Sequence, residues 1–353
     1  MTVYVANYES GTVTPIRAAT NKAGKAITVG FGASYIAITP NGKTAYVSSE
    51  STVTAIRTAT NTTLKTISVA NAGEIAITPN GKTAYVVSGS SVTPINTASN
   101  KAGKAIALGS QVNVIAMTPD GRTAYVAGID LRPANINAGL VTPINTATNK
   151  AGKAVTVGGW PDAIAITPNG RTVYVTDDEM GEGHMVTPIN TATNKAGKAI
   201  MVGSGPRFIA ITLDGKTAYV ANGGSHTVTP INTATNKAGK AITVGIAPLA
   251  IAMTPDGKTA YVANALSNTV TPIRTATNTA LKAIKVGIDP LSVAITPDGK
   301  TAYVANTGGI DISGDTVTPI RTATNTALKA IKVGIGPIFV AITPPAPCSR
   351  RSR

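Results

Sequence analysis

Residues able to do chemistry are concentrated in a few irregular segments of this 353-residue chain. The segment DDEMGEGH, residues 177–184, places four carboxylates ahead of a histidine. Carboxylates in a loop can hold a hard cation, and Asp177, Glu179 and Glu182 are the candidates, with His184 nearby. The segment lacks the ordered ligand spacing of an EF-hand loop. We therefore assign it no metal and no cofactor.

Other irregular segments add charged and aromatic side chains: GIDLRPANINAGL (128–140) and the short loops around the sole tryptophan and around the Arg-Phe pair at 207–208. An aromatic ring beside mixed charges suits a sugar or another small polar ligand. The competing interpretation is that these are ordinary solvated loop residues. The candidate ligand-binding set is Asp130, Arg132, Trp160, Asp162, Asp177, Asp178, Glu179, Glu182, His184, Arg207 and Phe208. No residue is assigned a catalytic role.

Several enzyme classes lack their characteristic residues in this chain. Its two histidines, His184 and His226, are too few for a multi-histidine copper centre. No nucleophile elbow supports Ser-His-Asp chemistry. Cys348 is the only cysteine, so an intramolecular disulfide is impossible.

The elements that must position these loops are repeats. A tyrosine within TAYVAN or a close variant recurs at positions 4, 46, 85, 125, 174, 219, 261 and 303, which defines eight units of about 42 residues. Each unit holds four short runs rich in Val, Ile and Thr, separated by turn signals such as TPDGK and ATNKAGK. This pattern is typical of a β-propeller blade. A β-solenoid, the alternative, usually has shorter repeats.

We therefore predict an all-β fold: one eight-bladed β-propeller of four-stranded antiparallel blades over residues 1–343. The repeats start near residues 2, 44, 83, 123, 172, 217, 259 and 301. The chain opens on a second strand and ends on an innermost one. Pairing of Ile338–Thr343 with the strands near Val3–Ala6 should therefore close the ring and favour a monomer. The basic tail, residues 344–353, is expected to be disordered.

A proline occupies the same position of the TVTPI run in seven units, while the second unit has Ala55. Proline cannot donate to a sheet ladder. We expect the third strand either to bulge there or to turn the nitrogen away from a partner. The prolines are Pro15, Pro94, Pro143, Pro188, Pro230, Pro272 and Pro319.

The net charge of +15 is unevenly distributed within the repeat. Because strands alternate in direction, the TPDGK and ATNKAGK turns share one face, with 20 Lys or Arg against four Asp. The other loops share the opposite face, with 11 Asp or Glu against two Arg. We name these the turn face and the loop face. The basic ring could contact an anionic cell-wall polymer, or its lysines could serve solubility alone. Nucleic acid is disfavoured because no aromatic residues interleave with the lysines.

Across residues 2–343, the motifs YVAN, TVTPI, ATN and IAITPDGKTAYV resemble the YVTN-type propeller repeats of bacterial surface-layer and YncE-like proteins. The proline of TVTPI is a departure, since the family more often has an apolar residue there. The resemblance implies a non-catalytic binding or surface-interaction propeller. Its partner would be a small polar ligand, a carbohydrate or a protein, bound by the loop face.

The same resemblance implies an extracytoplasmic or cell-surface location, although the N-terminus reads as a strand and not as a signal peptide. No apolar run is long enough for a membrane helix. Lactonases share YVTN-like propellers, so a lactonase-like hydrolase with its site in the loops of blades four to six is the alternative. Only residues 177–184 could supply the carboxylate–histidine or metal-centred site that such an enzyme needs.

Overall fold

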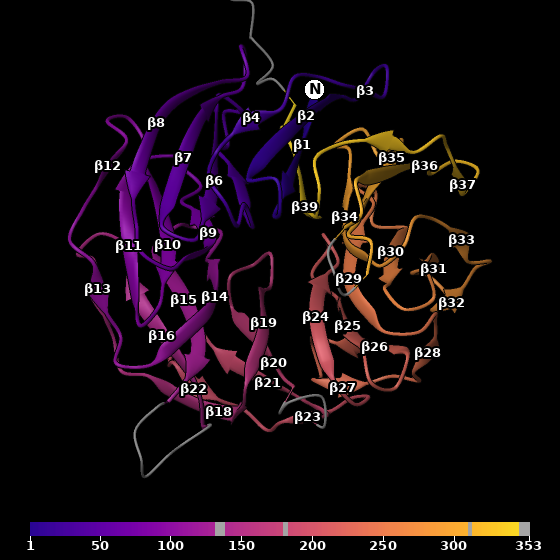
Figure 1. Cartoon of the computed structure of the whole chain (residues 1–353). Coiled ribbons are helices and arrows are strands. Elements are labelled where there is room, and N and C mark those ends of the chain that lie inside the picture. Colours follow the sequence, from indigo (N-terminus) through magenta and orange to yellow (C-terminus); the bar gives the residue numbers. More distant parts are fainter. Residues whose placement is uncertain (131–137, 179–182, 310–312, 346–353) are drawn as a thin grey trace, which may run out of the picture.

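The computed structural model describes residues 1–130, 138–178, 183–309 and 313–345, and their regular structure is all β. The strands form eight antiparallel sheets arranged as blades around a central axis (Figure 1). The predicted eight-bladed propeller is thereby confirmed. The tail, residues 344–353, is predicted to be disordered. Its residues 346–353 lie outside the described part of the chain. The described residues contain no helix long and apolar enough to cross a membrane.

Each blade has strand positions A to D from the axis outward. The A strands of blades 1–8 are β39 (Pro337–Ile342), β5 (Ile36–Ile38), β9 (Ala72–Ile77), β14 (Gln111–Met117), β19 (Pro161–Ile166), β24 (Pro206–Ile211), β29 (Pro248–Met253) and β34 (Pro290–Ile295). The B strands are β1 (Thr2–Asn7), β6 (Thr44–Ser49), β10 (Thr83–Ser88), β15 (Thr123–Ile129), β20 (Thr172–Asp177), β25 (Thr217–Asn222), β30 (Thr259–Asn264) and β35 (Thr301–Asn306).

The C strands are β2 (Thr12–Arg17), β7 (Thr52–Arg57), β11 (Ser91–Asn96), β16 (Ala138–Asn145), β21 (Met185–Asn190), β26 (Thr227–Asn232), β31 (Thr269–Arg274) and β36 (Thr316–Arg321). Blade 2 has one continuous D strand, β8 (Thr62–Ser68). The other blades have two short D segments each: β3 (Lys22–Ala23) and β4 (Ile27–Thr28), β12 (Lys101–Ala102) and β13 (Ile106–Ala107), β17 (Lys150–Ala151) and β18 (Val155–Gly159), β22 (Lys195–Ala196) and β23 (Ile200–Met201), β27 (Lys237–Ala238) and β28 (Ile242–Thr243), β32 (Thr279–Ala280) and β33 (Ile284–Lys285), β37 (Thr326–Ala327) and β38 (Ile331–Lys332).

The ring closes where the sequence predicts. Strand β39 pairs antiparallel with β1, in a register that sets Val340 opposite Val5. Thr2 N also donates to Thr343 Oγ1 at 2.9 Å, and Figure 1 shows β39 beside β1. One blade is therefore built from both ends of the chain, and its inner edge is paired.

The hydrophobic core lies between the blades. The B strands, with sequences such as TAYVAN, are buried on both faces because each packs against a neighbouring blade. At the junction of blades 1 and 2, Tyr4 and Val13 pack with Val47 and Ile56. Burying a side chain of this size stabilises the fold by about 1.5–3 kcal/mol.

The prolines interrupt the fourth strand of the blade. The expected bulge in the third strand is wrong. The third strand does not bulge against the second, because Tyr4 and Pro15 are directly paired in a regular register. The carbonyl of Pro15 instead accepts a hydrogen bond from Gly24 N at 2.7 Å, on the outer side. Backbone nitrogen and carbonyl of one strand residue point to the same side. The nitrogen therefore faces strand D, and that strand is interrupted there.

Blade 2 provides a natural control for this effect of proline. It has Ala55 at the proline position, and its D strand continues past this residue, with Ala55 paired to Lys65. The seven blades that carry proline all have a D strand split into two segments. The missing N–H group of proline therefore decides whether the outer strand is continuous.

A tyrosine–asparagine hydrogen bond joins each blade to the next. Tyr219 is fully buried, and its hydroxyl donates to Asn278 Oδ1 of the next blade at 2.6 Å. Asn278 has a φ of +51°, the left-handed conformation that asparagine tolerates. The equivalent pairs are Tyr4–Asn61, Tyr46–Asn100, Tyr85–Asn149, Tyr125–Asn194, Tyr174–Asn236, Tyr261–Asn325 and Tyr303–Asn21.

Replacing one of these tyrosines should measurably destabilise the protein. We expect Tyr219→Phe to lower the free energy of unfolding by about 1 kcal/mol, because it removes one hydrogen bond while keeping the packed ring. Tyr8→Phe is the matched control, since Tyr8 is half-buried and packs its ring against Phe31. Thermal or denaturant unfolding measures the stability of both variants. Equal losses of stability would contradict a stabilising role for the Tyr219–Asn278 hydrogen bond, which we call the latch.

Introducing proline into blade 2 should split its fourth strand. We expect Ala55→Pro to accelerate amide hydrogen exchange in residues 62–68 to the level of residues 101–107 in blade 3, because the ladder loses its donor. Pro94→Ala should slow exchange in residues 101–107. Mass spectrometry of these two peptides measures both effects, and unchanged exchange after Ala55→Pro would refute the assignment.

Candidate functional site

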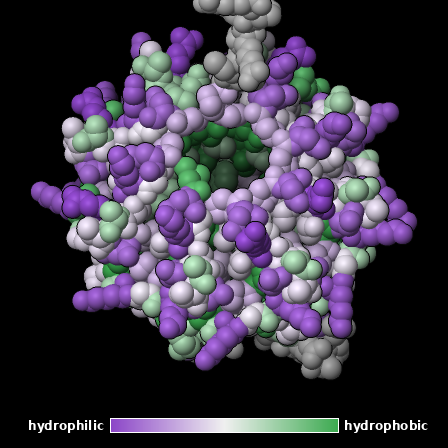
Figure 2. All heavy atoms as spheres, turned by 180° about the vertical axis from the view of Figure 1, so that it is seen from behind, coloured by the Kyte–Doolittle hydropathy of each residue, from purple (hydrophilic) through white to green (hydrophobic). Residues whose placement is uncertain are grey.

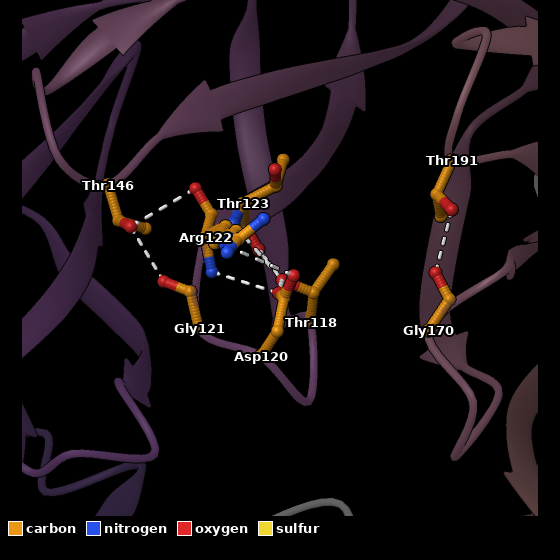
Figure 3. Close-up of polar contacts among 8 residues, drawn as sticks. All are labelled: Thr118, Asp120, Gly121, Arg122, Thr123, Thr146, Gly170 and Thr191. Carbon is orange, nitrogen blue, oxygen red and sulfur yellow. Dashed lines mark hydrogen bonds and ion pairs between the residues drawn. The ribbon is translucent and has the colours of Figure 1, made fainter.

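The A–B turns of the turn face are held by short polar networks, and Figure 3 shows the one in blade 4. Thr118 Oγ1 donates to Asp120 Oδ1 at 2.7 Å. Asp120 Oδ1 also accepts from Arg122 N at 3.0 Å, and Thr118 Oγ1 accepts from Thr123 N at 3.0 Å. These bonds fix the turn backbone from which the basic side chain projects.

A second threonine ties the C–D turn to the A–B turn of the same blade. Thr146 Oγ1 donates to the carbonyl of Gly121 at 2.6 Å, and Thr191 makes the equivalent bond to Gly170 in blade 5 (Figure 3). The two turn classes therefore share one face, as predicted.

Carboxylates occupy only part of this turn face. The A–B turns of blades 4, 6, 7 and 8 contain Asp120, Asp214, Asp256 and Asp298, whereas those of blades 2, 3 and 5 contain Asn41, Asn80 and Asn169. Three of the aspartates lie within ion-pair distance of the following base: Arg122 at 3.8 Å, Lys216 at 3.6 Å and Lys258 at 4.0 Å.

The turns that contain asparagine leave the first blades with an uncompensated positive charge. Residues 17–25, 41–43, 57–65, 80–82 and 96–104 hold nine Lys or Arg and no Asp or Glu. We call this surface the basic arc. A cavity of about 500 Å³ in it is lined by Lys43, Arg57, Leu64 and Asn100 among others.

On the loop face, the structure brings three of the predicted site residues together. Arg207 Nη1 lies 3.3 Å from Asp162 Oδ2 and 3.1 Å from Asp178 Oδ2. Arg207 and Asp162 side chains are 41% and 39% exposed, whereas that of Asp178 is 5% exposed. One guanidinium therefore bridges a buried and an accessible carboxylate, contributed by blades 5 and 6.

Burial and the charge of Arg207 have opposite effects on the pKa of Asp162. Burial raises the pKa of Asp162, and the ion pair and hydrogen bond with Arg207 counteract that rise. Accessible charged groups held by fixed partners can exchange those partners for a polar ligand. We call Asp162, Asp178 and Arg207 the polar cluster.

The other predicted residues have different environments. Phe208 follows Arg207 on β24 and is 37% exposed. Trp160 is half-buried with a φ of +38°, and its carbonyl accepts a hydrogen bond from Asp178 N at 3.2 Å. His184 is exposed.

Two predicted aspartates are part of the fold. Asp130 is buried, and its N–H donates to the carbonyl of Ala138 at 2.9 Å. Asp177 ends β20 and is buried, with its carboxylate packed directly against Gly158. Arg132, Glu179 and Glu182 lie outside the described residues. Among the described residues, no group of three or more His, Cys, Asp or Glu side chains could hold a metal ion.

The central opening is an apolar hollow. Figure 2 shows one face of the ring with hydrophilic side chains around a central hollow whose wall is hydrophobic. The inner strands present half-buried residues such as Ala76 and Ile77 of β9.

Glu74 is the residue near this axis that our sequence analysis missed. Its Oε2 accepts a hydrogen bond from Ile115 N of the next inner strand at 2.9 Å. Burial raises the pKa of Glu74 to about 7, against the lowering effect of that bond. Burial raises the pKa of Tyr35 to about 12, with further contributions from the charges of Glu74 and Asp162.

The raised pKa gives Glu74 a defined effect on stability. The folded protein favours the protonated form of Glu74. Its contribution to the free energy of unfolding is therefore complete below the ordinary pKa of 4.5 and is lost as pH rises through about 7. A comparison of the repeats could have revealed it: the equivalent residues are Tyr35, Val114, Ala163, Phe208, Ala250, Ser292 and Phe339, all uncharged.

Comparisons with solved structures show the same fold in other proteins. A hydrazine synthase from Kuenenia stuttgartiensis is 24% identical over 82% of this chain and 96% of that chain, with a TM-score of 0.66. The dihydro-haem d1 dehydrogenase NirN in complex with DHE is 14% identical over 95% of this chain and 73% of that one, with a TM-score of 0.78. A protein of unknown function from Desulfotomaculum acetoxidans is 18% identical over 80% and 94% of the two chains, with a TM-score of 0.62. At such identities the likeness concerns the fold alone.

A family model gives a more specific match. No curated protein matches the chain. Residues 209–313 match the model described as a YncE-like β-propeller. The matched stretch carries the same repeat and the same four-strand blade as the rest of the ring, so the resemblance to YncE-like β-propellers that the repeats indicate is confirmed over these residues.

Proposed function

We propose that this protein is a non-catalytic binding propeller, and that the loops of blades 4–6 on the loop face bind a polar ligand of carbohydrate type. The observation that carries this proposal is the polar cluster. Arg207 and Asp162 are each about two-fifths exposed while held 3.3 Å apart, so their spare hydrogen-bonding capacity faces solvent in fixed positions.

The residues beside the cluster have the chemistry of a sugar site. A sugar offers hydroxyl groups to carboxylates and guanidinium groups and an apolar ring face to aromatic side chains. Phe208 is exposed next to Arg207, and Trp160 is joined to Asp178 through its backbone. These residues occupy the part of the ring where the repeats differ, as expected of a specific site.

A second contact with an anionic polymer is supported by the basic arc. Its nine basic residues include Lys43 and Arg57, which line one cavity without an aspartate beside them. We propose that a linear polyanion binds there. The turns of blades 6–8 are poorer candidates because their aspartates offset the adjacent lysines.

Substitution of Arg207 tests the polar site. In calorimetric titrations with a panel of neutral and acidic oligosaccharides, we expect Arg207→Ala to weaken binding about tenfold or more, equivalent to roughly 1.4 kcal/mol. Arg171→Ala, an exposed arginine of the turn face, should have no effect. Asp162→Asn is a second variant that retains the shape of the site.

The hydrolase alternative is tested in the same series. Turnover of a lactone panel that His184→Ala abolishes would contradict the non-catalytic proposal. Oligosaccharide binding that Arg207→Ala and Asp162→Asn leave unchanged would refute the site, and so would a panel without any binding.

A matched pair of lysines tests the basic arc. We expect Lys43→Ala to weaken the binding of inorganic polyphosphate and to reduce the slope of log affinity against log salt by about 1. Lys258→Ala should change both less, because Lys258 is already paired with Asp256. Equal effects of the two substitutions, or affinity that does not depend on salt, would contradict the proposal.

A further inference from the structure

A row of apolar side chains is exposed on the loop face, beginning at blade 6 and running round to blade 2. Each blade passes to the next through a D–A loop that begins, in most units, with Val-Gly. The residue after this pair is Ile246, Ile288, Ile335 and Phe31 in four successive loops, from blade 6 round to blade 2. The corresponding residues in three of the other loops are Ser110, Gly159 and Ser204.

These apolar side chains are well exposed. Ile246 is 47% exposed, Ile288 59%, Ile335 50% and Phe31 54%, and Leu266 beside Ile246 is 71% exposed. We call these five residues the apolar arc. Single exposed hydrophobic residues are common on protein surfaces, but here exposed apolar residues occupy the equivalent position in four successive loops. Several exposed apolar side chains on one face of a protein favour an interaction site.

The backbone beneath the apolar arc is fixed by hydrogen bonds to the neighbouring B–C loops. The carbonyl of Ile246 accepts from Leu266 N at 3.2 Å, and that of Ile288 accepts from Gly308 N at 3.1 Å. The carbonyl of Ile335 accepts from Ser10 N at 3.3 Å. The arc therefore has a defined shape before any partner binds, which lowers the entropic cost of binding.

A second set of apolar residues lies on the innermost strands of three of these blades. Leu249, Leu291 and Ile338 follow the arc residues by three positions and are half-buried. The other five blades have Ser34, Gly73, Asn113, Asp162 and Arg207 at this position. Three successive blades therefore carry apolar residues at both positions, whereas the other five have a polar residue or glycine at the second.

Carboxylates border the apolar arc. Glu50 N donates to the carbonyl of Phe31, and the Glu50 side chain packs against Gly32. Glu9 lies one residue before Ser10, and Asp289 directly follows Ile288. Asp315 is paired with Lys332 at 3.3 Å. The basic residues near the arc are Lys332 and Lys285, which lies on the outer strand β33. They are fewer than the four carboxylates named above.

We propose that the apolar arc docks a cationic amphipathic polypeptide segment. Its apolar side chains would lie on Ile246, Ile288, Ile335 and Phe31, and its basic side chains would meet Glu9, Glu50 and Asp289. An apolar surface bordered by carboxylates favours a partner that carries both features, and disfavours an acidic one by repulsion. The proposal is independent of the polar site in blades 4–6.

Fluorescence anisotropy with two defined peptides tests the proposal. The probe is a short labelled peptide of alternating leucine and lysine, and the comparison peptide replaces each lysine by glutamate. We expect the lysine peptide to bind at least about tenfold more tightly. Affinity should fall as salt is raised, because the flanking charge pairs are exposed.

The double variant Ile288→Ser, Ile335→Ser should weaken binding of the lysine peptide by about tenfold or more, through the loss of buried apolar area. Serine is tolerated by the fold at this point, since Ser110 and Ser204 stand there in other loops. Leu213→Ser, which alters an exposed leucine (64%) in an A–B turn of the turn face, is the matched control and should have no effect.

Three results would overturn the proposal. The first is equal affinity for the two peptides. The second is an unchanged affinity in the double variant. The third is concentration-dependent self-association in sedimentation velocity that the double variant abolishes, which would assign the arc to a second copy of this chain.

Discussion

The hydrogen bond from a buried tyrosine to the turn asparagine of the next blade is the contact on which the ring depends. It joins two positions that are each difficult to change. The tyrosine fills the space between blades, and the asparagine adopts a φ of about +50°, which few residues besides glycine tolerate. The eighth bond, Tyr303 to Asn21, crosses from the last blade to the first. The ring is therefore closed by the same contact that joins its other blades, in addition to the pairing of β39 with β1.

This hydrogen bond also explains which parts of the repeat can vary between blades. On the turn face it fixes the C–D turns, and Thr146 and its equivalents fix the A–B turns against them. Variation there is limited to side chains that project outward, as in the exchange of Asp120 for Asn80 or Asn169. On the loop face the connections take no part in the latch. They can differ in length and composition without disturbing the junctions between blades.

The sequence predicted the ring, its closure and the faces, because each follows from periodicity and strand direction alone. It did not predict which strand the prolines interrupt. That outcome depends on which side of strand C the nitrogen of Pro15 faces, and a repeat pattern does not specify this. The sequence placed Arg207, Asp162 and Asp178 in one candidate set but did not predict the contact between them, because that contact joins different blades. Glu74 was missed because its neighbours in sequence form an ordinary apolar strand. Its significance appears only when position is compared across blades, and its burial follows from the approach of the next inner strand.

The loop face combines two kinds of surface that arise differently. The polar cluster consists of departures from the repeat: Arg207 and Asp162 stand where other blades have leucine, isoleucine or small residues. Two residues of the apolar arc belong to an identically repeated segment. The twenty residues TVTPIRTATNTALKAIKVGI occur twice without change, and each copy ends in an arc residue, Ile288 or Ile335. A repeated segment reproduces its surface at each blade that carries it, so an extended partner would meet the same side chain in successive blades. A departure occurs once and suits a compact ligand. The two proposed sites on the loop face would therefore suit partners of different shape, and one scaffold can present both because the junctions between its blades lie elsewhere.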